Sequence, residues 1–453
     1  YSLRNSACEV TRYNIVHQDQ YRIKDVRTAM TFVPIGNFQR PQLRSMSCGC
    51  QRIYVQLICF LVFVLLIMVI RMVTNMRVVF VQYHMASDTD GELVLLPADF
   101  AASQGAYCLD GSPPGYYIRY GKSPNINKWM IYLPGGAWCT SFDIFYRSFS
   151  DLGSSTDAPA LSAFSGILSA SEKDNPDFHK WNMVKFMYCD GSSFLGNRSG
   201  TLNYKSKHIY LRGFAVFNAL IDHLIKHTDL SSADNVILAG SSAGGLGALI
   251  NGDFLRDKLS SIESLHVILD GMMFTDQPSV TGEHVMANLL KNTFYFHNIK
   301  DTASIKDCTS EMTPTEQWKC LLPEYYYKHV YTPAFFIQSF HDTWYFSHAL
   351  GIQCSTTECK SSDKINKNRQ TVLSLMQQVM GSDGDGLFAS SCPFHWVLLK
   401  STFYENLNIN GTTVHDVVGQ WYFHRKTAPV HWIQNEDLTK MNNKCNSNLY
   451  NNL

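Results

Sequence analysis

Residues 129–338 alternate short apolar runs with patterns of helical spacing. The runs are rich in β-branched and aromatic side chains, and each therefore predicts a strand. They lie at residues 129–133, 184–188, 236–239, 266–269 and 334–338. Between the second and third runs, residues 212–227 carry apolar side chains on one helical face. Strands that alternate with helices predict a mostly parallel sheet covered on both faces, and hence an α/β domain.

The longest apolar run occupies residues 53–70, where Gln56 is the only clearly polar side chain. At about 1.5 Å per residue it would span roughly 27 Å, close to the hydrocarbon thickness of a bilayer. Residues 1–52 hold eight Lys or Arg against three Asp or Glu. Because positive charge gathers on the cytoplasmic side, this run predicts a transmembrane signal anchor over 53–73 with the N-terminus inside.

The anchor divides the chain into four predicted parts. Residues 1–52 are expected to form a disordered tail, 53–73 the anchor, 74–95 a stalk and 96–453 the α/β domain. A cleaved signal peptide and a buried core helix are the alternatives for the apolar run. The preceding leader is too long for the first, and the run lacks the polar face of the second. Because the chain begins with Tyr1 and not Met, we expect the natural start to lie upstream.

Composition and charge exclude two classes of protein. The 453 residues are 45% hydrophobic and 17% charged, which is too apolar for a disordered chain. The 38 Lys and Arg balance 38 Asp and Glu without a long basic run, so nucleic acid is not expected as a partner. Nothing in the pattern predicts an oligomeric state.

The predicted anchor also divides the 13 cysteines. Nine follow it and would face an oxidising lumen, where disulfides form and persist. Spacing favours local bridges from Cys308 to Cys320 and from Cys354 to Cys359, and an odd number leaves one thiol over. No Cys or His spacing typical of a metal site occurs, so no metal is expected.

Two glycosylation sequons begin at Asn197 and Asn410. Both would lie on the lumenal or extracellular side of the predicted anchor, where N-glycosylation takes place. The anchor and the sequons together predict a single-pass type II membrane protein whose large domain is lumenal or extracellular. Cleavage of the stalk would release this domain in soluble form.

The sharpest chemical signal follows the third predicted strand. Residues 240–244 read Gly-Ser-Ser-Ala-Gly and lead into a helical pattern through residues 249–255. A nucleophile at a tight turn from strand to helix has a strained backbone, and small neighbours let the chain pass. This context predicts Ser242 as a nucleophile and the N–H of Ala243 as an oxyanion donor. A glycine turn used only for packing is the alternative. A phosphate-binding loop is not favoured, because no Lys follows the last Gly.

A second oxyanion donor is expected after the first predicted strand. Residues 133–139 read Leu-Pro-Gly-Gly-Ala-Trp-Cys and occupy the position that hydrolases with a nucleophile turn use for this purpose. Gly136 and Ala137 are the predicted donors, each contributing roughly 3 kcal/mol to transition-state stabilisation.

A serine nucleophile needs a base, and the base needs an acid that orients it. Asp270 and Asp342 both follow predicted strands and are candidates for the acid. His395 is a candidate for the base, as are three later histidines: His415, His424 and His431. With 16 His in the chain, composition alone leaves both choices open.

From Cys108 to His395 the chain resembles the pectin acetylesterase and Notum family of serine carboxylesterases. The resemblance rests on an ordered series of segments at residues 108–117, 135–139, 166–169, 175–178, 188–194, 240–247, 342–344 and 391–395. It implies an α/β-hydrolase fold with a triad of Ser242, Asp342 and His395. It also implies an oxyanion hole made by Gly136, Ala137 and Ala243, and no metal or organic cofactor.

This chain departs from the family pattern around its oxyanion loop. Pro134 stands where the family usually has Glu, and Ala137 stands where the Notum branch, which removes palmitoleate from Wnt proteins, has a bulky aromatic residue. Trp138 comes second, as in the pectin acetylesterase branch. Cys139 and Cys392 would staple the loops of the site, yet no cysteine follows Cys139 closely, so Cys139 is the first candidate for the odd thiol.

The resemblance implies a carboxylic-ester hydrolase that removes O-acyl groups from an extracellular glycan or protein. A palmitoleoyl-protein carboxylesterase acting on lipidated proteins is the nearest alternative, and a serine peptidase is another. A catalytically inactive hydrolase fold used for adhesion or binding is the alternative from a different class. The sequence does not decide the length of the acyl group.

Overall fold

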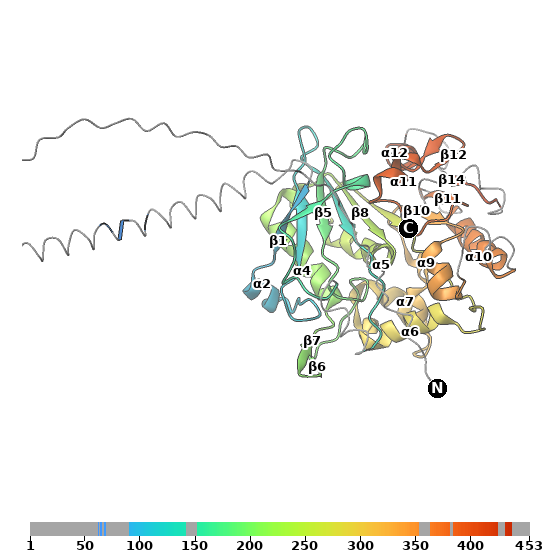
Figure 1. Ribbon diagram of the computed structural model, residues 1–453, viewed down its shortest axis with the longest axis horizontal. Helices are drawn as coiled ribbons and strands as arrows, with labels where there is room; N and C mark the ends of the chain where they lie inside the picture. Colours follow the sequence, from blue (N-terminus) through green and yellow to red (C-terminus); the bar gives the residue numbers. More distant parts are fainter. Residues whose placement is uncertain are drawn as a thin grey trace, which may run out of the picture. The chain divides into compact units, whose positions relative to one another are not determined.

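The computed structural model describes residues 62, 64, 65, 68, 90–141, 152–352, 363–380, 384–424 and 431–436. The chain divides into two compact units, one made of Tyr1–Val10 with Asp88–Leu453 and one of Thr11–Ser87. Every strand of the described residues belongs to the first unit, whose ribbon is shown in Figure 1.

A sheet of ten strands forms the framework of this unit. The strands are β1 (Asp90–Leu95), β2 (Gly115–Arg119), β3 (Lys128–Leu133), β4 (Leu161–Ala163), β5 (Asn182–Phe186), β8 (Asn235–Ser241), β9 (Ser264–Asp270), β10 (Ala334–Ser339), β11 (Gly386–Ser390) and β14 (His431–Ile433). Their order is β14-β11-β10-β9-β8-β3-β5-β2-β1-β4. Every neighbouring pair from β14 to β5 is parallel, which confirms the predicted mostly parallel sheet.

The other edge of the sheet is antiparallel and begins earlier in the chain than predicted. β2 pairs antiparallel with both β5 and β1, and β1 pairs antiparallel with β4. Residues 90–95, which were expected to end a stalk, form β1, with Glu92 opposite Ile118. Only one residue of β1 is fully buried, so the sequence of this strand carries a weak apolar signal.

All five predicted strands are present, as β3, β5, β8, β9 and β10. The sequence gives little sign of β11, which is five residues long, or of β14, which is three. β11 has only three apolar residues, between Gly386 and Ser390, and β14 is too short to show a period. Their place in the sheet comes from pairing with β10 and with each other.

Alternate residues of β3 point into two different hydrophobic cores. Trp129, Ile131 and Leu133 belong to one core, and Met130 and Tyr132 belong to the other. Successive side chains of a strand leave the sheet on opposite faces, so both faces of β3 are covered. The near-continuous apolar run of this strand has the same cause.

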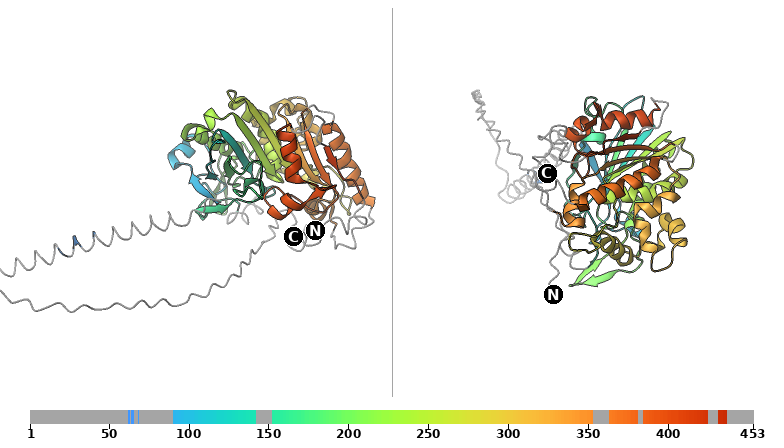
Figure 2. Two further views of the ribbon diagram at one scale, coloured as in Figure 1. Left: turned by 90° about the horizontal axis from the view of Figure 1, so that it is seen from above. Right: turned by 90° about the vertical axis from the view of Figure 1, so that its right-hand side faces the viewer.

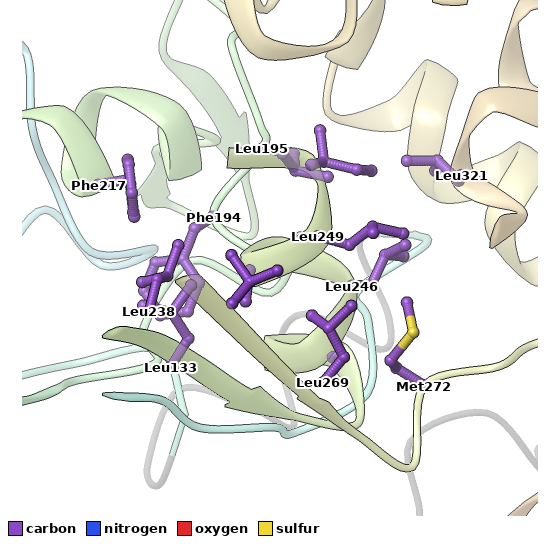
Figure 3. Close-up of a cluster of buried hydrophobic side chains, with 14 of the residues drawn as sticks. Leu133, Phe194, Leu195, Phe217, Leu238, Leu246, Leu249, Leu269, Met272 and Leu321 are labelled. Carbon is purple, nitrogen blue, oxygen red and sulfur yellow. The ribbon is translucent and has the colours of Figure 1, made fainter. Parts of the chain in front are cut away.

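Helices cover both faces of the sheet (Figure 2). The first core includes residues of α4 (Gly213–His227), α5 (Ala243–Lys258) and α10 (Asp363–Met380). The second includes residues of α11 (Ser401–Asn406) and α12 (Val414–Tyr422). Figure 3 shows part of the first core, where Leu133, Leu238 and Leu269 of the sheet lie near Leu246 and Leu249 of α5. α4 matches the helix predicted over 212–227.

The predicted anchor over 53–73 lies outside the described residues except for Val62, Val64, Leu65 and Met68, which are helical. The predicted tail over 1–52 also lies outside them. Within the described ranges, no helix has both the length and the apolar character that a bilayer crossing requires.

Two disulfides join described cysteines. Cys108 is bonded to Cys189, and Cys308 is bonded to Cys320 as spacing predicted. Cys392 is disulfide-bonded as well, whereas Cys354 and Cys359 lie outside the described residues, as does the bridge predicted between them. Cys139 is a buried thiol, which confirms it as the candidate for the odd thiol, whereas the staple predicted there is wrong.

The two bridges allow a matched test of how loop length contributes to stability. The bonded cysteines are 81 residues apart in Cys108–Cys189 and 12 apart in Cys308–Cys320, and all four are buried. Replacing both cysteines of a pair by Ser should lower the free energy of unfolding about 1.5 kcal/mol more for the longer loop. Guanidinium unfolding of the two variants measures this difference, and an equal loss would contradict the loop-entropy explanation.

Candidate active site

The turn that carries Ser242 joins β8 to α5 at the centre of the sheet. Ser242 has φ 55° and ψ −126°, a strained conformation for a residue with a side chain. Its N–H donates to the main-chain oxygen of Asp270 at 2.8 Å, and its own carbonyl oxygen accepts from Leu246 at 3.1 Å. These bonds hold the turn in this conformation at the start of the helix.

The two glycines that flank Ser242 are required by close backbone contacts. A Cβ at position 244 would lie 2.0 Å from the carbonyl oxygen of Leu133, and one at position 240 would lie 2.3 Å from that of Gly244. A side chain at position 244 would therefore push the turn away from β3, and one at position 240 would push β8 away from the start of α5. The Gly-x-Ser-x-Gly pattern thus follows from how closely the turn approaches β3 and how tightly it folds on itself.

The structure brings Ser242, His395 and Asp342 together. Nε2 of His395 lies 2.8 Å from Oγ of Ser242, although the two residues are 153 positions apart. Nδ1 of the same ring lies 2.9 Å from Oδ2 and 3.0 Å from Oδ1 of Asp342. All three are buried, with exposed fractions of 6%, 9% and 4% respectively. The polar contacts therefore act with little competition from water.

Main-chain and side-chain donors fix the carboxylate of Asp342. It caps the short helix α9 (Thr343–Tyr345), where the N–H of Tyr345 donates to Oδ1 at 2.9 Å. Nε2 of Gln338, in β10, lies 3.4 Å from Oδ2. The sequence Asp-Thr-Trp-Tyr thus places a carboxylate at the end of β10 and turns it toward the imidazole.

The other predicted candidates for the acid and the base have different contacts. Asp270 directs its Oδ2 atom to Ser241 and to two main-chain N–H groups, not to the ring of His395. His415 lies in α12 beside Asp416, His424 follows the end of that helix, and His431 lies in β14. Burial raises the pKa of Asp270 to about 6.

The loop after β3 lies directly against the Ser242 turn. A Cβ at Gly135 would be 2.7 Å from Cβ of Ser242, and Ala137 has φ 55°. In the part of the chain that the structure describes, the N–H groups of Gly136, Ala137 and Ala243 make no hydrogen bond. They are therefore available to an acceptor bound beside Ser242.

Neighbouring residues hold this loop in place. The hydroxyl of Tyr188 donates to the carbonyl oxygen of Ala137 at 2.6 Å, and the N–H of Cys139 donates to that of Gly191 at 2.9 Å. Nε1 of Trp138 donates to Oγ of Ser193 at 2.7 Å. These three contacts come from the residues after β5, which lies beside β3.

Aromatic rings pack around the imidazole, and the sequence analysis did not identify them as part of the site. Trp344 stacks on His395 with ring centroids 5.4 Å apart, and Trp344 also stacks on His348 at 4.9 Å. Trp138 contacts Phe274 and Trp344 edge to face at 5.1 and 6.2 Å. The position of Trp344, two residues after Asp342 at the start of a helical turn, was the available signal.

The two sequons differ in accessibility. Asn410 is exposed in the turn between β12 (Asn408–Ile409) and β13 (Thr412–Thr413). Asn197 is partly buried, and its Nδ2 donates to the main-chain oxygen of Asp301 at 2.8 Å. Asn410 is therefore the more accessible acceptor for a glycan, whereas one N–H of the Asn197 amide is already engaged.

Similarity to known proteins extends over most of the chain. The pectinacetylesterase family profile matches residues 85–446. Pectin acetylesterase 5 from Arabidopsis thaliana is 31% identical over 347 residues, covering 72% of this chain and 79% of the relative. Palmitoleoyl-protein carboxylesterase NOTUM from Schmidtea mediterranea is 29% identical over 342 residues, covering 71% of this chain and 61% of the relative.

A solved structure has the same fold. The structure of the Wnt deacylase Notum from Drosophila superposes with a TM-score of 0.65 at 23% sequence identity. The match covers 76% of this chain and 98% of that chain.

The α/β fold with its large, mostly parallel sheet, together with these relatives, defines the class of the protein as a carboxylic-ester hydrolase. Within that class, the chain belongs to the pectinacetylesterase family.

The stacked ring of Trp344 should affect the reactivity of Ser242 by fixing the plane of the imidazole. An aromatic pair contributes about 0.5 to 1.5 kcal/mol, so Trp344→Ala should slow fluorophosphonate labelling of Ser242 about 2- to 10-fold. Trp344→Phe should restore most of the rate because it keeps a stacked ring. His348→Ala, which removes a ring stacked on Trp344 but leaves Trp344 beside the imidazole, serves as the control, and an equal loss in that variant would refute the explanation.

Proposed function

We propose that this protein is a serine O-deacylase in which Ser242 is the nucleophile, His395 the general base and Asp342 the acid that orients the imidazole. The contact of 2.8 Å from Ser242 Oγ to His395 Nε2, continued at 2.9 Å to Asp342, carries the proposal. A hydroxyl, an imidazole and a carboxylate in this order are the groups that acyl transfer through serine requires.

The reaction proceeds in two steps that use the same residues. His395 takes the proton of Ser242 as Oγ attacks the ester carbonyl, and it then donates that proton to the departing alcohol. Water, activated by His395, next attacks the acyl-enzyme and releases the carboxylic acid and Ser242. Asp342 keeps the proton of the neutral imidazole on Nδ1 and stabilises the imidazolium that forms in each step. No metal or organic cofactor takes part.

We assign the oxyanion hole to the N–H groups of Gly136, Ala137 and Ala243. Support comes from the contact of Gly135 with Ser242 and from the lack of hydrogen bonds to these three groups among the described residues. Donors that are already fixed before the reaction stabilise the developing charge without reorganisation, and one such donor contributes about 3 kcal/mol.

The substrate that we propose is a short O-acyl group on an extracellular glycan. Ala137 places only a methyl group in the oxyanion loop. The rings of Trp138, Phe274 and Trp344 pack against one another. The relative at 31% identity is named a pectin acetylesterase. Removal of palmitoleate from a protein is the second candidate, because other relatives are named palmitoleoyl-protein carboxylesterases.

We further propose that the domain faces the lumen or the cell exterior on a type II anchor over residues 53–73. Disulfides between buried cysteines support an oxidising compartment. Val62, Leu65 and Met68 are helical and expose 59%, 63% and 66% of their surfaces, as apolar residues of a helix that faces lipid would.

Substitution of the proposed triad tests the chemistry. Ser242→Ala should abolish hydrolysis of p-nitrophenyl acetate by the purified protein, because no other group forms the acyl-enzyme. Asp342→Asn should lower kcat by roughly 10⁴ while leaving the fold intact, because the imidazole then adopts the wrong tautomer. Undiminished turnover in Ser242→Ala would overturn the assignment. Faster turnover of a matched amide than of the ester would favour a peptidase.

Acyl length separates the two candidate substrates. In a series of p-nitrophenyl esters from acetate to palmitoleate, kcat/KM should be highest for acetate, because each added methylene must displace packed aromatic rings. A maximum at eight or more carbons would instead favour lipid removal. If the folded protein hydrolyses no ester and its Ser242 does not react with a fluorophosphonate, the protein is a binding module.

A further inference from the structure

Asp270 is a buried carboxylate that connects the Ser242 turn to the loop of His395. It ends β9, next to the end of β8, and has an exposed fraction of 0%. Its Oδ2 atom accepts hydrogen bonds from Oγ of Ser241 at 2.8 Å and from the N–H groups of Val397 and Leu398 at 2.8 and 2.9 Å. One oxygen atom thus receives donors from both sides of the site.

The main chain around Asp270 makes the same connection. The carbonyl oxygen of Asp270 accepts from the N–H of Ser242 at 2.8 Å. Gly271, with φ 61°, packs so closely on the other loop that a Cβ there would lie 2.0 Å from the carbonyl oxygen of His395. On the far side of Ser241, the hydroxyl of Tyr132 donates to Ser241 Oγ at 2.7 Å. These contacts extend from β3 through β8 and β9 to the loop of the base.

We propose that Asp270 is a positioning residue of the reaction: it sets the distance between Ser242 and His395 by binding the Ser242 turn and the His395 loop at once. The proposal rests on the proposed function of that pair. Without the carboxylate, two buried N–H groups two and three residues after His395 would lose their acceptor, and the loop would move to find another. Displacement of a catalytic group by about 1 Å costs roughly 100-fold in rate.

The charge of Asp270 can be separated from its role as a hydrogen-bond acceptor. The titratable groups that interact with it are Tyr132 of β3, His395 and Lys400. Burial raises the pKa of Asp270 to about 6, so the carboxylate is ionised at neutral pH. The carboxylate loses this charge when it is protonated, whereas Asn at position 270 carries no charge at any pH.

Two substitutions separate the acceptor from the charge. Asp270→Asn keeps an oxygen that can accept the same three hydrogen bonds but removes the charge, whereas Asp270→Ala removes both. We expect Asp270→Ala to lower kcat for p-nitrophenyl acetate about 100-fold with little change in KM. Asp270→Asn should stay within about tenfold of wild type, and its kcat/KM profile should lack the inflection near pH 6 that protonation of Asp270 gives the wild type.

Asp253 offers a matched control. It is also buried, and it lies on α5 and not at the site. Its carboxylate accepts hydrogen bonds from the N–H groups of Thr332 at 2.9 Å and Tyr331 at 3.2 Å. Asp253→Ala should lower Tm as Asp270→Ala does, but leave kcat unchanged. If both variants lose only Tm, Asp270 is merely structural and the proposal is wrong. The proposal would also be overturned if Asp270→Asn lowered kcat as much as Asp270→Ala does.

A spectroscopic readout makes the result independent of ester turnover. The low-field proton resonance of the His395–Asp342 hydrogen bond reports on the placement of the His395 loop. It should persist in Asp270→Asn and shift or broaden in Asp270→Ala, and an unchanged resonance in Asp270→Ala would contradict the proposal. Ser242→Ala tests the proposed function separately, since its failure to abolish turnover would leave this structural result standing. If Asp270→Ala does not fold, the pH profile of Asp270→Asn decides.

Discussion

The close approach of two turns, one after β3 and one after β8, is the constraint on which the site depends. The carbonyl oxygen of Leu133 lies where a side chain at position 244 would have to begin, and Gly135 lies against the side chain of Ser242. Parallel pairing of β3 with β8 brings these two strand ends to the same level. Ser242 therefore leaves the sheet with a strained backbone, directly beside the N–H groups of the neighbouring loop.

Burial gives this arrangement its chemical value. Ser242, His395 and Asp342 are each exposed by less than a tenth of their surface, so their hydrogen bonds act in a medium of low dielectric constant. The same burial makes every unsatisfied polar group costly, and the loops at this edge of the sheet are held by hydrogen bonds to main-chain groups. Tyr188 holds the oxyanion loop, and Asp270 holds the loop of the base.

The parts of the site thus come from the carboxyl ends of neighbouring parallel strands. The oxyanion loop follows β3, the nucleophile follows β8, Asp270 ends β9, and Asp342 follows β10. His395 comes after β11, the next strand in the order. Any displacement of one strand against another changes several contacts at once, so stability of the sheet and geometry of the site are tied together.

The sequence by itself determined the features that depend on local rules. Ser242 could be predicted because a strained turn needs small residues within five consecutive positions, and five strands could be predicted because each is a continuous apolar run. Spacing along the chain could not decide between Asp270 and Asp342, which only the family resemblance separated, since both follow a strand and their roles depend on which loop each one faces. Nor could the sequence show that Trp344 stacks on His395, or that β1 lies within the predicted stalk. These were decided only by tertiary structure, because strand order and register, and not spacing along the chain, determine which strand ends meet.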